Sequence, residues 1–223
     1  MTLLIDADDT LWENIRVFHD VNASFVEWIA PAEPPSKIRS ELDAMQIEFV
    51  GLHGYGRRTF QKSLLAAVER FGQRAPTPDD HSIVETLVSP LRWDTLDLIE
   101  GVTQTLAELR TRHDLIMMTK GDHEEQSHKV ARSGLGEHFV AVEIVAEKNV
   151  DAYKMVVDRH DLDLGTTWMI GNSPRSDILP ALHAGLGAVH IPHDDTWGHE
   201  HDDLDHHPRL MHLPSFDRLL DHF

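Results

Sequence analysis

Asp6 and Asp8 form an Asp-x-Asp pair directly after a short apolar run, Leu3–Ile5, and Thr10 follows them. A carboxylate at such a strand end can attack phosphorus and hold the phosphoryl group as an aspartyl-phosphate. A second carboxylic acid two residues further on can protonate the leaving oxygen and then deprotonate the attacking water. Because a carboxylate and a phosphate repel each other, this reaction needs a hard cation between them, and Mg²⁺ prefers oxygen ligands. The start of the chain therefore predicts chemistry on a phosphate ester.

The Asp-x-Asp spacing is weak evidence by itself. The pairs Asp161/Asp163 and Asp203/Asp205 share it, and neither follows a clear strand. The context of the motif must therefore decide, and three further apolar runs supply that context. Each is followed by polar side chains suited to binding a phosphoryl group or a cation: Thr119 and Lys120 after residues 115–118, Lys148 after residues 139–145, and Asn172 and Asp177 after residues 168–170.

Strands and helices are expected to alternate in the second part of the chain. This order is typical of an α/β fold with a Rossmann-like parallel sheet and helices on both of its faces. In such sheets the functional groups gather where the strands end, at the carboxyl edge. The predicted strands are residues 3–5, 115–118, 139–145, 168–170 and 188–191, and the predicted helices lie near residues 102–109, 122–133, 150–160, 178–184 and 215–222.

Residues 14–90 lack this alternation. Their apolar residues recur at helical spacing, and the breaks between them carry proline and glycine, Pro31 among them. We therefore predict four helices and almost no strand in this stretch. The catalytic core is predicted to consist of residues 1–13 and 91–223, with the helical stretch as a separate insertion.

The order of these motifs resembles that of the haloacid dehalogenase-like (HAD) superfamily over essentially the whole chain. The resemblance implies a Mg²⁺-dependent phosphatase in which Asp6 is the nucleophile and Asp8 the general acid/base. It also implies that the insertion at residues 14–90 is a helical cap domain. Phosphate would be bound by Thr119, Lys148 and, beside them, Lys120, and Mg²⁺ by Asp6, Asp177, Asn172 and the backbone carbonyl of Asp8.

One position departs from the pattern of the superfamily, and the assignment of the phosphate-binding lysine has an alternative. Asn172 stands where many relatives have Asp, so we expect weaker metal binding without loss of activity. Lys154 lies six residues beyond Lys148 and is the alternative for the phosphate-binding lysine. Lys148 is favoured because it is nearer to the predicted strand end.

Within the predicted cap, Tyr55, Arg57 and Arg58 follow or flank two glycines, Gly54 and Gly56. Glycine allows a tight turn, and Tyr and Arg can stack on a substrate or pair with it. These three side chains are therefore candidates for substrate specificity. The alternative is a plain connection between helices with arginines on its surface.

The chain of 223 residues has 38 acidic and 20 basic residues, and its formal net charge is −18. This charge disfavours nucleic-acid binding through a broad basic surface. The absence of cysteine excludes disulfides, iron–sulfur clusters and a cysteine nucleophile. No apolar run is long enough for a signal peptide or a membrane span, so we expect a cytoplasmic protein, a monomer or a homodimer.

A histidine-rich segment from His190 to His207 contains six histidines among many aspartates. It could bind zinc or nickel, or it could be a solvated polar loop, which is the interpretation we favour. Residues 197–200 could contact the active-site edge, because this loop follows the last predicted strand of the sheet. If it were a metal-binding interaction surface, the protein would not need to be an enzyme.

A phosphatase that acts on a small phosphorylated metabolite is the function these motifs favour. Phosphoryl transfer within a sugar phosphate, as in a mutase, and dehalogenation are the alternatives on the same fold. A phosphonate hydrolase would use a lysine of the cap as a Schiff base, and Lys37 and Lys62 are the lysines found there.

Overall fold

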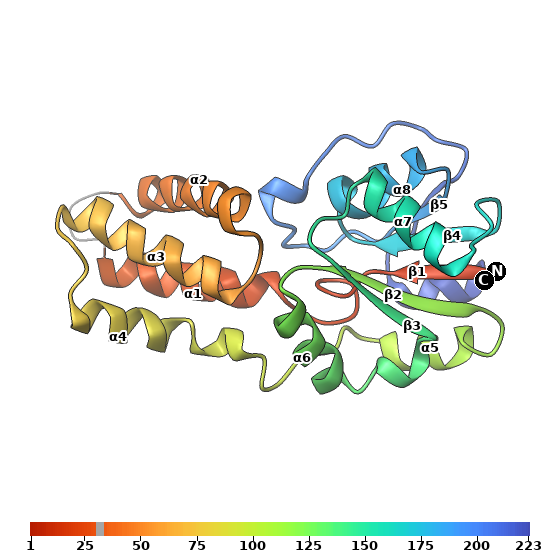
Figure 1. Ribbon diagram of the computed structural model, residues 1–223, viewed down its shortest axis with the longest axis horizontal. Coiled ribbons are helices and arrows are strands. Elements are labelled where there is room, and N and C mark those ends of the chain that lie inside the picture. The colour runs from red at the N-terminus through yellow and green to blue at the C-terminus, as the bar shows by residue number, and fades with distance from the viewer. Residues whose placement is uncertain (30–33) are drawn as a thin grey trace. The chain divides into compact units, whose positions relative to one another are not determined.

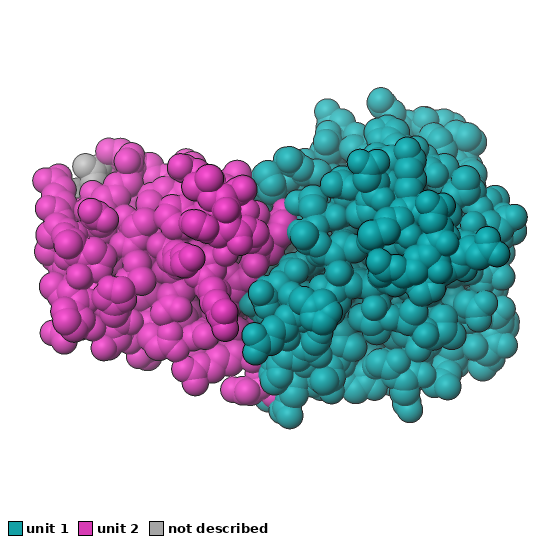
Figure 2. Space-filling view, viewed as in Figure 1, with its two compact units in different colours: residues 1–15, 95–223 teal, residues 16–94 magenta. Residues whose placement is uncertain are grey.

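The computed structural model describes residues 1–29 and 34–223. They divide into two compact units, one formed by residues 1–15 with 95–223 and the other by residues 16–94 (Figure 2). The sequence-based boundaries lay at residues 13/14 and 90/91, so residues 14–15 join the first unit and residues 91–94 the second. The predicted helix break at Pro31 lies outside the described residues.

A six-stranded sheet forms the centre of the first unit, in the order β3-β2-β1-β4-β5-β6 (Figure 1). All of its strand pairs are parallel, which confirms the predicted sheet type. β1 lies between β2 and β4, and its last residue, Ile5, is level with Met117 and Ile170. The strands are β1 Thr2–Ile5, β2 Asp114–Lys120, β3 Ala141–Val145, β4 Thr167–Gly171, β5 Gly187–His190 and β6 Leu210–His212.

Both faces of the sheet are buried, as the near-continuous apolar strands predict. Leu3 and Ile5 of β1 pack on one side with α5 (Val102–Leu109) and the C-terminal turn. Leu4 packs on the other side with α7 (Val150–His160) and α8 (Leu179–His183). Alternate residues of β2 divide between the same two clusters in the same way, as the side-chain period of a strand requires. The sheet is therefore covered by helices on both sides (Figure 1).

The helices of the first unit begin and end at residues with a clear local reason. The side chain of Asp122 accepts a hydrogen bond from the N–H of Glu125 at the start of α6, and Gly134 ends that helix in the left-handed region with φ 69°. Asn149 caps α7 in the same way through the N–H of Ala152. These helices are α5 Val102–Leu109, α6 His123–Ser133, α7 Val150–His160 and α8 Leu179–His183.

Two predicted helices differ from the observed ones, and one observed strand was not predicted. A single wide turn at Pro174–Ile178 precedes α8, which is shorter than the predicted helix. The last helix is a 3-10 turn, Phe216–Asp221. The strand β6 was not predicted, because Leu210–His212 is only three residues long and stands between polar residues.

The second unit contains four helices among its described residues, α1 Ile15–Ile29, α2 Pro35–His53, α3 Arg57–Gly72 and α4 Pro78–Leu87 (Figure 1), and α1 begins with the last residue of the first unit. The amides of Asn22 and Gln46 join α1 and α2 through two buried hydrogen bonds of 3.2 and 2.8 Å. A capping box between Thr77 and Asp80 starts α4. Across residues 1–29 and 34–223, no helix is both long and apolar enough to cross a membrane.

Candidate active site

Asp6 leaves β1 at the carboxyl edge of the sheet. Its N–H donates to the carbonyl of Ile170 on β4 at 2.9 Å, which continues the strand pairing by one residue. The chain then turns, and the hydroxyl of Thr10 donates back to Oδ2 of Asp6 at 3.1 Å. Asp6 is buried with an exposed fraction of 6%. The predicted nucleophile is therefore held in a fixed place at the centre of the edge.

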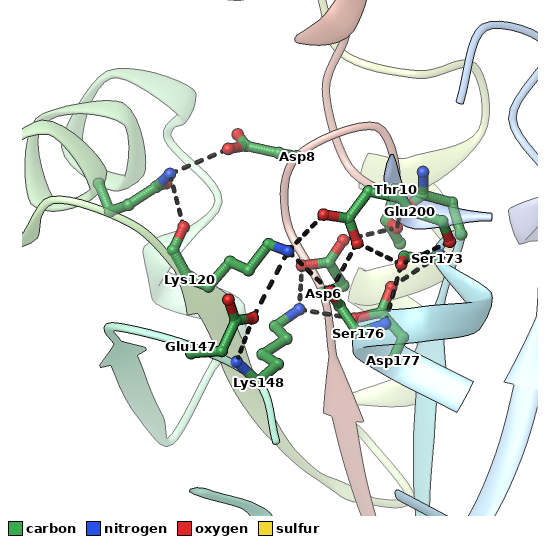
Figure 3. A network of polar contacts seen from close by, with 12 residues as sticks. Asp6, Asp8, Thr10, Lys120, Glu147, Lys148, Ser173, Ser176, Asp177 and Glu200 are labelled. Atoms are coloured by element: carbon green, nitrogen blue, oxygen red, sulfur yellow. Dashed lines mark hydrogen bonds and ion pairs between the residues drawn. The ribbon is translucent and has the colours of Figure 1, made fainter. Parts of the chain in front are cut away.

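Lys148 lies between two carboxylates from different strands (Figure 3). Its ammonium donates to Oδ1 of Asp6 and, at 2.7 Å, to Oδ1 of Asp177. Since both oxygens are within hydrogen-bond distance of one nitrogen, they lie no more than about 6 Å apart. The predicted nucleophile, the predicted metal ligand and the predicted phosphate-binding lysine are thus brought together, and Lys154 is exposed on α7.

The three charges of this cluster perturb one another. Burial, followed by the charge of Asp177, raises the pKa of Asp6 to about 7, although Lys148 opposes the change. Burial lowers the pKa of Lys148, but the two carboxylates outweigh it and the pKa is raised. A cation is therefore needed between Asp6 and Asp177, and the ammonium of Lys148 is in that position.

The turn after β4 fixes the orientation of Asp177. Its Oδ2 accepts a hydrogen bond of 2.9 Å from the N–H of Ser173, so Oδ1 is left for the contact with Lys148. The carboxylate packs on Gly171 so closely that a Cβ there would lie 2.2 Å from Oδ2. The hydroxyl of Tyr153 on α7 donates to the carbonyl of Ser176 at 2.9 Å and so attaches this turn to α7.

The groups at this edge fit a hard divalent cation. Carboxylate oxygens of Asp6 and Asp177 converge there, and the amide oxygen of Asn172 is connected to them through Thr10, whose hydroxyl lies 3.4 Å from it. Oxygen donors of this kind suit Mg²⁺ and not a thiolate-preferring metal. Asn172 supplies one negative charge fewer than Asp would.

The side chain of Asp8 points away from Asp6 (Figure 3). Oδ1 accepts from the indole of Trp12 at 2.7 Å, and Oδ2 accepts from the amide of Gln126 at 2.9 Å. The buried ammonium of Lys129 lies 3.0 Å from both oxygens. Sequence reasoning missed Lys129, although Gln126 and Lys129 stand three residues apart on α6 and so share one face of it.

Thr119 and Lys120 end β2 at the same edge of the sheet. Thr119 is almost fully buried. The ammonium of Lys120 donates to the hydroxyl of Ser176 at 2.7 Å and pairs with Glu200 at 2.5 Å and Glu147 at 3.7 Å. Lys120 therefore has acidic partners within the protein, and its contact with phosphate stays a prediction.

Glu200 belongs to residues 197–200, for which contact with the active-site edge was an open possibility, but no role was predicted for Glu200 itself because the segment 190–207 was interpreted as a solvated loop. Its carboxylate is buried and accepts hydrogen bonds from the hydroxyls of Ser173 and Ser176, both at 2.6 Å. Burial alone would raise the pKa of Glu200, but the charge of Lys120 and these hydrogen bonds lower it to about 2. Glu200 is thus an ionised group inside the predicted site.

A second group of possible metal ligands consists of Asp9, Glu13 and His193. One ligand atom of each lies within 4.8 Å of the others, and none belongs to the predicted ligand set. Nε2 of His193 is 3.1 Å from Oε2 of Glu13, and burial raises the pKa of Asp9 to about 6. Of the histidines in the segment 190–207, His193 is the one that joins such a group among the residues that the structure describes.

The candidates for specificity lie at the start of α3 in the second unit. Gly56 precedes the helix with φ 123°, a conformation that favours glycine. Arg57 forms an ion pair of 2.6 Å with Glu85 and donates to the carbonyl of Val88 at 3.3 Å. These contacts give Arg57 a role in joining α3 to α4, and specificity roles for Tyr55 and Arg58 stay predictions.

The family model of haloacid dehalogenase-like hydrolases matches residues 1–185. The chain belongs to the haloacid dehalogenase-like hydrolase family. The predicted family membership is therefore confirmed, and this HAD protein is a hydrolase.

Two curated relatives and many solved structures, three of which are compared below, are similar to this HAD hydrolase. The N-acylneuraminate-9-phosphatases of Rattus norvegicus and Mus musculus are each 29% identical over 103 residues, 44% of this chain, and the match spans only 42% of their own length. A haloacid dehalogenase-like family hydrolase from Xanthomonas campestris has a TM-score of 0.82 and 27% identity, and covers 96% of this chain and 86% of its own.

The other two structures show the fold alone, since each is 17% identical to this HAD hydrolase. The putative HAD-hydrolase YfnB from Bacillus subtilis, bound to magnesium, has a TM-score of 0.70. A 2-haloacid dehalogenase from Pseudomonas syringae has a TM-score of 0.65. Both alignments cover 99% of this chain and 96% of the other chain. The fold is therefore shared with a protein that is named for dehalogenation.

Proposed function

We propose that this HAD hydrolase is a Mg²⁺-dependent phosphatase that acts on a small phosphorylated metabolite through an aspartyl-phosphate. The observation that carries the proposal is the convergence of Asp6, Asp177 and Lys148 at the ends of β1, β4 and β3. The partial similarity to two phosphatases supports the same reaction class. The similarity to a dehalogenase concerns the fold and does not select between the reactions.

Asp6 and Asp177 would hold Mg²⁺ together with Asn172 and the carbonyl of Asp8, and the ion would supply the positive charge that lets an anionic substrate approach. A carboxylate oxygen of Asp6 forms the bond to phosphorus while the bond from phosphorus to the ester oxygen breaks. Lys148 and Thr119 bind the non-bridging oxygens and stabilise the charge that spreads over them. Because Lys148 already contacts Asp6, it aligns nucleophile and phosphate together.

Asp8 protonates the leaving oxygen and then takes a proton from the water that cleaves the aspartyl-phosphate. Its carboxylate is hydrogen-bonded to Trp12, Gln126 and Lys129, and its charge is balanced by Lys129. Before it can act as an acid, Asp8 must turn out of these contacts and take up a proton from the solvent. It then gives one proton to the leaving oxygen and gains one from the attacking water, so it ends the cycle protonated, as it entered it.

The test is phosphate release from p-nitrophenyl phosphate and from a panel of metabolite phosphates, with Mg²⁺ and with a chelator. We expect release that depends on Mg²⁺ and is abolished by Asp6→Asn. Asp161→Asn is the matched control, because Asp161 begins another Asp-x-Asp pair but is exposed beyond α7.

Full activity of Asp6→Asn would refute the covalent route. Halide release from a 2-haloacid without added metal, in place of phosphate release, would replace the phosphatase by a dehalogenase. Conversion of a sugar phosphate to its isomer without free phosphate would identify a mutase.

A further inference from the structure

Glu200 enters the catalytic edge from the loop between β5 and β6. It lies outside residues 1–185, which the family model matches. The short turn Gly198–Glu200 brings its side chain inward, and the residue is only 9% exposed although its neighbours in sequence are polar. Arg175 donates to the carbonyl of His199 at 3.4 Å and attaches this turn to the segment after β4.

The two oxygens of Glu200 have separate partners (Figure 3). Oε1 accepts from the ammonium of Lys120 at 2.5 Å. Oε2 accepts from the hydroxyls of Ser173 and Ser176, both at 2.6 Å. One carboxylate thus connects the end of β2 with the turn after β4.

Ser173 transmits this connection to the predicted metal ligand. Its hydroxyl donates to Glu200 and accepts from the N–H of Ser176 at 3.0 Å, while its own N–H donates to Oδ2 of Asp177 at 2.9 Å. The orientation of the Asp177 carboxylate therefore depends on where Ser173 is held. Ser173 is 5% exposed and Asp177 is 1% exposed, so water cannot readily replace these contacts.

We propose that Glu200 is a positioning residue for the divalent cation of the active site, acting through Ser173 on Asp177. This inference rests on the proposed function, because it assigns the cation to Asp6 and Asp177. It places control of metal affinity in a loop that follows the family's motifs in the chain. Groups that orient metal ligands without touching the metal commonly change metal affinity by about 10- to 100-fold when they are removed.

A glutamine cannot replace this carboxylate. Its amide offers one acceptor oxygen and one NH₂ group that only donates. If the oxygen faces the two serines, the NH₂ group faces the ammonium of Lys120, and the reverse orientation turns two donors toward the hydroxyls. Glu200→Gln therefore breaks one side of the network while it keeps the volume of the side chain.

Glu147→Gln is the matched control for charge. Glu147 pairs with the same ammonium of Lys120 at 3.7 Å but is about half exposed, with 48% of its side chain accessible. Its Oε1 accepts from the N–H of Lys148, a contact that the glutamine oxygen can keep. Both variants remove a negative charge near the same lysine, but Glu200→Gln also places a donor against a donor in a buried network that includes Ser173 and Ser176, whereas Glu147 has no contact with these serines among those described.

The experiment is a calorimetric titration of the full chain with Mg²⁺ in the absence of substrate. We expect Glu200→Gln to raise the dissociation constant about tenfold or more, and Glu147→Gln to change it less than about threefold. Ser173→Ala is expected to have the same effect as Glu200→Gln. The double variant Glu200→Gln/Ser173→Ala is expected to bind Mg²⁺ no more weakly than either single variant, because both substitutions remove the same link between Glu200 and Ser173.

Wild-type affinity in Glu200→Gln, or an equal loss in Glu147→Gln, would overturn the proposal. If Glu200→Gln does not fold, Ser173→Ala decides in its place, and unchanged Mg²⁺ binding there would overturn the proposal. Failure of the proposed function can be recognised separately. If the wild-type protein binds Mg²⁺ but does not hydrolyse phosphate esters, the phosphatase proposal fails, and the dissociation constants of the variants can still be compared. A wild-type protein that binds no Mg²⁺ would refute both.

Discussion

Replacing Lys148 by methionine tests how much the buried charge cluster contributes to stability. Lys148 has an exposed fraction of 3%, and it separates Asp6 from Asp177, which are also buried. Methionine keeps an unbranched side chain of similar length but has no charge. Removing one partner from a buried ion pair costs about 3 to 5 kcal/mol, because the remaining charge is left without compensation. Here two like charges remain.

The expected loss of thermal stability is large enough to measure easily. About 2 to 4 °C of melting temperature corresponds to 1 kcal/mol for a protein of this size, so a loss of about 3 to 5 kcal/mol predicts a fall of roughly 6 to 20 °C. Lys154→Met is the control, since Lys154 is exposed on the neighbouring helix α7. The measurement is thermal unfolding by circular dichroism with a chelator at pH 8.

Both a lower pH and added Mg²⁺ should reduce the loss of stability in Lys148→Met. Burial raises the pKa of Asp6 to about 7 in the wild type, above its unfolded value of 3.8, and removing Lys148, which lowers this pKa, raises it further. The stability lost through this group is therefore greatest above that raised pKa and is relieved as the pH falls toward 3.8. Mg²⁺ at a hundred times its dissociation constant stabilises by about 2.7 kcal/mol. Melting temperatures of Lys148→Met within about 2 °C of the wild type, or an equal fall in Lys154→Met, would show that the cluster is not a buried charge pair that needs compensation.

Three further perturbations test other parts of the same structure. Below about pH 7, Mg²⁺ must displace a proton from Asp6, so its apparent dissociation constant should fall by up to about tenfold for each unit by which the pH rises between 5.5 and 7. Calorimetry can measure this change, and a dissociation constant that does not depend on pH would contradict the raised pKa of Asp6. Gly171→Ala should weaken Mg²⁺ binding more than about tenfold, because its Cβ would lie 2.2 Å from the carboxylate of Asp177. Gly51→Ala is the control, because its Cβ meets no atom within 4 Å in α2, and it should leave Mg²⁺ binding nearly unchanged. Arg209→Lys should cost about 1 to 3 kcal/mol in chemical unfolding, because the guanidinium donates to four backbone carbonyls and an ammonium cannot span them; a loss below about 0.5 kcal/mol would refute this role.

The strands and the groups that follow them could be predicted from the sequence, because the information is local. A short apolar run that polar residues end, such as Leu3–Ile5, is typical of a buried strand, and Asp6 comes next in the chain wherever that strand lies. In parallel sheets the carboxyl ends meet at one edge, so Asp6 and Asp177 could be expected there together. The observed contact of both residues with Lys148 agrees with that expectation.

The partners of these groups were decided by tertiary structure. Glu200 and Lys129 stand among polar residues, and nothing in their neighbours distinguishes a buried carboxylate or ammonium from a solvated one. Each is buried because a group far away in the chain compensates its charge, Lys120 for Glu200 and Asp8 for Lys129. Local patterns predict which elements form, whereas pairing of opposite charges across more than a hundred residues, as between Asp8 and Lys129, arises only when the elements pack.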